Sequence, residues 1–156
     1  IEPTKLLTKI ENPLIAGFLN YKVSKAIKNG IEVRYDCIFP KCEIKIPEYQ
    51  IVEMMGIICD NAYEEMSKRD KDKIIVIKLF LEGDKIAFFV ANPYQDNDIE
   101  SLSKFFERGY SSKGKERGIG LAKLKRMINE NRGDILISQE ELYGVNMIRI
   151  GILINI

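Results

Sequence analysis

The chain has 156 residues, of which 46% are apolar and 30% charged, and its formal net charge is +1. These values fit one soluble globular domain with its own core, and they give no indication of a nucleic acid or a membrane surface as partner. The absence of histidine excludes a Cys/His zinc site and a histidine base within the chain. Three cysteines without a Cys-x-x-Cys pair are typical of a reducing compartment. Because the sequence begins with Ile1 rather than Met, we expect it to be part of a longer protein.

The first elements expected are a helix and a strand. Residues 1–12 carry little pattern and are interpreted as the end of a preceding element or a linker, ahead of a domain over residues 13–156. Apolar residues recur at helical spacing from Pro13 up to Asn29-Gly30, which ends the predicted helix. Alternation over residues 31–36 then predicts a half-buried strand.

A second helix is predicted from about Glu48 to Ser67, and it carries polar residues inside an apolar stretch. The residues that can share one edge of this helix are Glu53, Asp60, Asn61 and Glu64. Asp and Asn are unfavourable in helix interiors, so Asp60-Asn61 lowers the local stability of the predicted helix, which indicates a functional role for the pair. Carboxylate and amide oxygens suit Mg²⁺, whereas a solvated helix edge is the alternative interpretation.

Two strands are predicted next, over Ile74–Leu81 and Lys85–Ala91, joined by a turn at residues 82–84. The second strand ends at Asn92-Pro93, and the end of an apolar strand is a common place for ligand contacts. A turn-forming Asn-Pro pair is the alternative. Asp98 can cap the start of a short helix that follows.

A polar, basic loop rich in Gly and Ser follows the aromatic pair Phe105-Phe106 and ends in Gly118-Ile119-Gly120-Leu121, where a third helix, predicted over Gly118–Asn131, begins. A helix start offers unpaired N–H groups and a positive dipole end, and glycines let the backbone approach a phosphate closely. The junction therefore indicates a nucleotide-phosphate clamp, with a flexible surface loop as the alternative. Two closing strands are predicted, over residues 134–138 and 145–154.

The predicted order of elements is helix, strand, helix, hairpin, short helix with loop, helix, hairpin. Helices confined to one face of a mixed, mostly antiparallel sheet would bury these patterns, which predicts an α+β two-layer sandwich. The order lacks the strict alternation of a Rossmann fold, and no G-x-x-x-x-G-K-[ST] motif is present.

Three motifs, taken in chain order, resemble those of the GHKL ATPases, the superfamily of gyrase, Hsp-type chaperones, histidine kinases and MutL. Asp60-Asn61-Ala62 resembles the N box, Phe105-Phe106 with Ser111-Ser112-Lys113-Gly114 resembles the F box and ATP lid, and Gly118-Ile119-Gly120-Leu121 resembles the second glycine box. The run from Gly56 to Glu65 is most similar to the AgrC-like quorum-sensing sensor kinases, and the resemblance covers residues 11–154. It implies the GHKL (Bergerat) form of the two-layer sandwich.

The resemblance also implies an activity: the domain would bind ATP with Mg²⁺ and transfer the γ-phosphate to a histidine on a neighbouring dimerisation domain. Asn61 would coordinate the Mg²⁺ and is the implied catalytic residue. The residues implied to bind the nucleotide are Asn61, Glu64, Asn92, Phe106, Ser111, Ser112, Lys113, Arg117, Gly118, Gly120 and Leu121. Catalysis would then consist of positioning and charge neutralisation, as phosphoryl transfer requires.

The sequence departs from the family pattern at three points. Asn92-Pro93-Tyr94-Gln95-Asp96 stands where the first glycine box usually reads Asp-x-Gly-x-Gly, although the amide oxygen of Asn92 can still accept a hydrogen bond from the adenine amino group. Ile57 stands where many relatives carry a polar or acidic residue, which argues against an efficient hydrolase. The acceptor histidine must lie outside the chain, and residues 1–12 would be the end of the dimerisation helix or a linker.

Two other functions compete with a sensor histidine kinase. A GHKL serine kinase of the anti-sigma-factor type would be expected to carry glutamate at position 57 and glycines in the first box, and both are absent. The second alternative is a non-catalytic interaction domain with a degenerate nucleotide pocket. The kinase interpretation implies a response regulator downstream, and the AgrC-like resemblance implies a membrane-attached homodimer with this domain in the cytoplasm.

Overall fold

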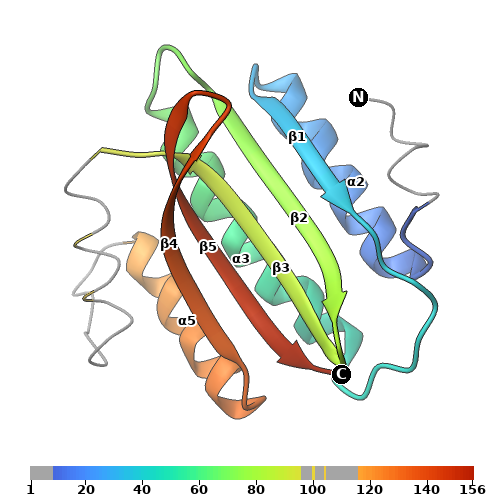
Figure 1. Cartoon of the computed structure of the whole chain (residues 1–156). Coiled ribbons are helices and arrows are strands. Elements are labelled where there is room, and N and C mark those ends of the chain that lie inside the picture. The colour runs from blue at the N-terminus through green and yellow to red at the C-terminus, as the bar shows by residue number, and fades with distance from the viewer. Residues whose placement is uncertain (1–8, 96–99, 101–103, 105–115) are drawn as a thin grey trace.

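A five-stranded sheet and a layer of helices make up the fold (Figure 1). The computed structural model describes residues 9–95, 100, 104 and 116–156. The helices are α2 (Pro13–Lys28), α3 (Glu48–Ser67) and α5 (Glu116–Glu130), and the strands are β1 (Glu32–Cys37), β2 (Ile74–Glu82), β3 (Lys85–Pro93), β4 (Asp134–Leu142) and β5 (Val145–Asn155). The strand order is β1-β2-β3-β5-β4; β1 and β2 are parallel, and the other neighbours are antiparallel. The predicted α+β sandwich with a mixed, mostly antiparallel sheet is confirmed.

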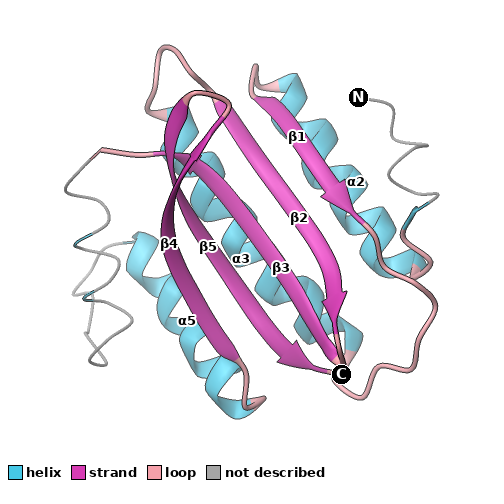
Figure 2. Cartoon of the chain, in the orientation of Figure 1, coloured by secondary structure: helices cyan, strands magenta, loops and turns pink. Residues whose placement is uncertain are grey.

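The core lies between the helices and one face of the sheet (Figure 2). Alternate residues of β3, namely Ile86, Phe88 and Val90, face the helix layer, as the two-residue period of a strand requires. Helical spacing does the same for α3, which buries Ile51 and Met54 against the sheet. The central helix is therefore fixed in rotation by its apolar side.

The helix α2 begins where the sequence predicts. Asn12 caps it, because its Oδ1 accepts a hydrogen bond of 3.0 Å from the Ile15 N–H, and Pro13 occupies the first turn. Ahead of the cap, Ile10 is buried in the core and forms a parallel bridge with Phe39. The domain boundary expected after residue 12 stays a prediction, but the described residues 9–12 already pack against the domain.

Several element boundaries differ from the predicted ones by a few residues. β1 extends to Cys37, and β3 includes Asn92 and Pro93 instead of stopping at Ala91. β4 continues to Leu142, because a two-residue turn with positive φ at Tyr143 and Gly144 keeps the hairpin paired to its end. α5 begins at Glu116, two residues before the predicted start.

The other face of the sheet is partly covered by the β4–β5 hairpin, whose tip bends over it toward β2 (Figure 1). A small apolar cluster of Ile74, Val76, Ala91 and Met147 lies on this face. At the tip, the Arg34 guanidinium lies 5.0 Å from the centre of the Tyr143 ring. Among the helices that the structure describes, none is long and apolar enough to cross a membrane.

Candidate functional site

Asn61 differs in position from the other polar residues of α3. Its side chain is buried, with 7% exposed, whereas Asp60 has 57% of its side chain exposed and Glu64 faces solvent. Glu53 forms an ion pair of 2.5 Å with Lys123 of α5, while Asp60 pairs with Lys22 of α2. The expected common edge is thus divided between two flanks, and Asn61 alone turns inward.

Contacts between α3 and α5 define where Asn61 lies. The two helices are antiparallel: Asn131 Nδ2 donates to Gln50 Oε1 at 3.1 Å, the pair Glu53–Lys123 follows, and a Cβ placed on Gly120 would lie 3.6 Å from Ile57 Cγ2. One turn beyond Ile57 is Asn61, and one turn before Gly120 is the start of α5. Asn61 therefore lies level with the N-terminal end of α5.

That end of α5 is chemically suited to an anion. The first four N–H groups of a helix have no intrahelical acceptor, and here they belong to residues 116–119. The helix dipole adds partial positive charge at the same place. Gly118 is within this first turn, whereas Gly120 lies against Ile57 and Leu121 is buried in the core. An N–H at position 121 has the carbonyl of residue 117 as its helical partner, because the helix begins earlier than predicted.

Asn92 is the second buried polar residue, with 2% exposed. It follows Ile86, Phe88 and Val90 in the alternation of β3, so it lies on the face that the helices cover. Its Nδ2 donates a hydrogen bond of 2.8 Å to the Pro93 carbonyl. α3 packs against β3, and the two run in the same direction, so Asn61 and Asn92 lie toward the same end of the domain (Figure 1).

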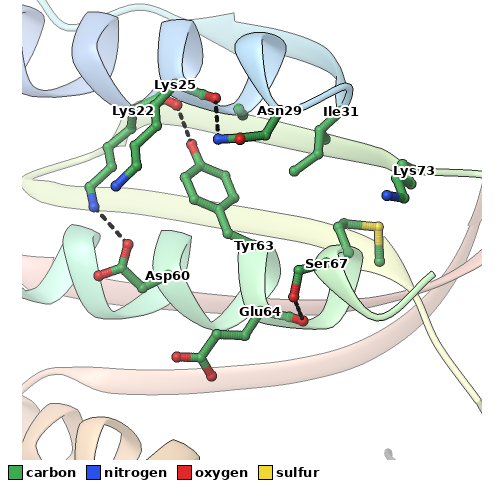
Figure 3. A pocket seen from close by; sticks show the side chains of 11 residues that line it. Lys22, Lys25, Asn29, Ile31, Asp60, Tyr63, Glu64, Ser67 and Lys73 are labelled. Carbon is green, nitrogen blue, oxygen red and sulfur yellow. Dashed lines mark hydrogen bonds and ion pairs between the residues drawn. The ribbon is translucent and has the colours of Figure 1, made fainter. Parts of the chain in front are cut away.

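Glu64 lies on the outer side of α3, at the lip of a groove between α2 and α3 (Figure 3). The groove has a volume of about 580 Å³ and is lined by residues that include Lys22, Lys25 and Tyr63. The Glu64 carboxylate points away from α2, whereas that of Asp60 points to Lys22 (Figure 3). The groove is thus on the flank of α3 opposite α5, and it is separate from the place where Asn61 lies.

The structure brings together part of the predicted site. Asn61, Asn92, Gly118 and Gly120 gather around one end of α3, β3 and α5. Phe106, Ser111, Ser112 and Lys113 lie outside the described residues, and Arg117 is in the first turn of α5. Of the helix expected after Asp98, the structure describes Glu100 and Lys104, and both are helical. Sequence reasoning missed Lys22 and Tyr63, which contact each other across the α2–α3 interface, because no local pattern marks such a long-range contact.

Comparison with known sequences assigns the family. The family described as "GHKL domain" matches residues 47–151. "Sensor protein CitS" of Halalkalibacterium halodurans is 28% identical over 145 residues, which cover 88% of this chain and 26% of that protein. "Sensor histidine kinase DcuS" of Escherichia coli (strain K12) is 27% identical over 137 residues, which cover 86% of this chain and 25% of that protein. The chain therefore spans about a quarter of the length of the curated relatives it matches.

Solved structures show the same fold. The catalytic domain of the histidine kinase ThkA superposes with a TM-score of 0.60 at 17% identity, over 93% of this chain and 91% of that one. The mycobacterial sensor histidine kinase MprB superposes with a TM-score of 0.60 at 11% identity, over 90% of this chain and 95% of that one. At these identities the similarity concerns the fold, and it agrees with the order of elements described above.

Proposed function

We propose a kinase role for this chain because it belongs to the GHKL domain family. In this proposal it is the ATP-binding catalytic domain of a sensor histidine kinase, and it passes the γ-phosphate of Mg·ATP to a histidine on a dimerisation domain outside the chain. One observation carries the proposal: among the described residues, the buried polar side chains are Asn61 and Asn92. These are the two asparagines that the motifs assign to the metal and to the base.

The residues around Asn61 fit a metal–phosphate group. A buried amide oxygen is a suitable ligand for Mg²⁺, and the N-terminal end of α5 beside it would accept phosphate oxygens. In the described part of the chain, no cluster of three or more Cys, His, Asp or Glu side chains forms a metal site. A Mg²⁺ ion bound here would therefore take its remaining ligands from phosphates and water, as is usual in kinases.

Asn92 is proposed to read the adenine ring. Its Nδ2 is bonded to the Pro93 carbonyl, so the amide oxygen is the end with which it would accept a hydrogen bond from the base. The buried position supports discrimination, because a buried acceptor that is left without its donor costs about 1–3 kcal/mol. Guanine presents a carbonyl where adenine presents the amino group, so we expect ATP to be preferred.

The finer assignments belong to the proposal as well. Gly118, Gly120, Leu121, Arg117, Glu64 and the lid residues Phe106, Ser111, Ser112 and Lys113 are proposed to surround the nucleotide. We propose that the full-length protein is a membrane-attached homodimer with this domain in the cytoplasm, a phosphoacceptor domain and a response regulator as partners. An AgrC-like quorum-sensing role rests on the motif residues and requires a peptide-sensing segment elsewhere in the full chain.

The proposal is tested with Asn61→Ala in the full-length protein. We expect histidine phosphorylation from Mg·ATP to fall on the order of 100-fold, because the substitution removes a preorganised ligand at the transferring phosphate. Asn146→Ala is the matched control, since Asn146 is an exposed asparagine of β5. Radiolabelled phosphate in an acid-labile linkage is the readout. Equal phosphorylation by Asn61→Ala and the control would contradict the proposal.

A further inference from the structure

One side of α3 is fastened to α2 by contacts on three successive turns. Near the middle of the helix, a Cβ placed on Gly56 would lie 3.4 Å from the Phe18 ring. One turn on, Lys22 Nζ and Asp60 Oδ1 form an ion pair of 2.6 Å (Figure 3). One turn further, the Tyr63 hydroxyl donates a hydrogen bond of 2.6 Å to the backbone carbonyl of Lys22. The two polar contacts flank Asn61 in the sequence: Asp60 is the residue before it, and Tyr63 is two residues after it.

On the opposite side of α3, the contacts with α5 that the described side chains make lie in the turns before Asn61. The described contacts on that side involve Gln50, Glu53 and Ile57, and they end where α5 begins. At the level of Asn61, α3 is therefore held by the burial of its apolar side, which includes Ile58 and Ala62, and by these contacts with α2. Since Asp60 and Tyr63 are held on that side, the intervening Asn61 is turned away from α2 and into the domain.

The contacts of Lys22 with Asp60 and Tyr63 have a chemistry that fits a positioning role. The ion pair is buried on one side only: 13% of the Lys22 side chain is exposed, against 57% of the Asp60 side chain. Lys22 also neutralises the carboxylate that is next to the proposed metal ligand in the sequence.

We propose that Lys22, Asp60 and Tyr63 form a clamp that positions Asn61 for Mg²⁺ and thereby sets the metal dependence of nucleotide binding. They are positioning residues and act through Asn61. This inference rests on the proposed function, because it assigns to α2 a part in the same site. Removing a group that hydrogen-bonds directly to a metal ligand commonly changes metal affinity or activity by about 10–100-fold. The three residues act one step further out, through the position of α3.

The test is calorimetric titration of the chain with a non-hydrolysable ATP analogue, with Mg²⁺ and with EDTA. Asp60→Asn removes the charge of the pair, and Tyr63→Phe removes the donor. We expect each to weaken Mg²⁺-dependent binding roughly tenfold, at the lower end of that range, and to leave binding in EDTA unchanged. Glu32→Gln is the matched control: Glu32 pairs with Arg34 at 2.8 Å and has 56% of its side chain exposed, against 57% for Asp60.

Repeating the titration in the Asn61→Ala variant distinguishes an effect that acts through Asn61 from a general loss of structure. In Asn61→Ala, adding Asp60→Asn should change nothing further, because the residue that the clamp positions is already gone. Equal losses with Mg²⁺ and with EDTA, a loss that persists in the Asn61→Ala background, or wild-type binding by Asp60→Asn would each overturn the clamp. If the unsubstituted chain does not bind the analogue with Mg²⁺, the proposed function itself fails, and this inference fails with it.

Discussion

At the scale of single residues, burial distinguishes the polar side chain of α3 that faces the interior from those that face solvent, which the motifs alone could not do. Asp60, Asn61 and Glu64 are close in sequence and all polar, yet of the three only the uncharged Asn61 is buried. The spacing along α3 could predict that they share an edge, but not which helices lie on either side. That information resides in long-range contacts such as Lys22–Asp60 and Glu53–Lys123. Asn92 could be placed at a strand end from sequence, whereas its burial required the neighbouring strand and helix.

Cysteine reactivity gives a prediction at this scale. Burial raises the pKa of Cys37 and of Cys59 to about 12, so both are neutral thiols near neutral pH. Cys42 is partly exposed. We expect a disulfide reagent at pH 8 to label Cys42 quickly and the other two only as fast as the domain unfolds. Replacing Cys42 by serine should abolish the fast phase, and a second rapidly labelled thiol would contradict the burial described here.

At the scale of elements, the sequence predicts most of the fold because each element carries its own periodic pattern. The helix α2 has a cap, a first-turn proline and a terminating Asn29-Gly30, and all three mark its limits. The end of β4 was missed because Gln139, Glu140 and Glu141 read as polar loop. They are strand residues because β5 pairs with them up to the turn. Such pairing is a property of the hairpin rather than of either segment.

Replacing either of two glycines by alanine should change the free energy of unfolding in opposite directions. Gly151 of β5 is paired with Phe89 of β3, and a Cβ placed there would overlap the Phe89 ring. Gly151→Ala should therefore lower the free energy of unfolding by roughly 1–3 kcal/mol, as overpacking does. Gly17 lies exposed within α2 with no atom near such a Cβ, so Gly17→Ala should raise it by about 0.5–1 kcal/mol. Denaturant unfolding measures both, and a Gly151→Ala variant as stable as the unsubstituted chain would refute the packing of Phe89 on Gly151.

At the scale of the whole molecule, the arrangement of layers explains why the residues of the proposed site that the structure describes lie at one end. α3 is central in the helix layer, lies on β3 and is contacted by α2 on one flank and α5 on the other. The ends of α3 and β3 and the start of α5 then meet on the same side of the domain (Figure 1). Separate motifs in the sequence are thus brought to one place by the fold, and the family assignment and the described geometry support the same proposed site.

The measurement that tests this account most directly is calorimetric titration of the unsubstituted chain with non-hydrolysable ATP and GTP analogues, each with and without Mg²⁺. The account predicts binding of the ATP analogue that strengthens with Mg²⁺, because Asn61 would share the metal with the phosphates, and weaker binding of the GTP analogue, because Asn92 would lack its donor. No binding of the ATP analogue at millimolar concentration with Mg²⁺ present would contradict the account.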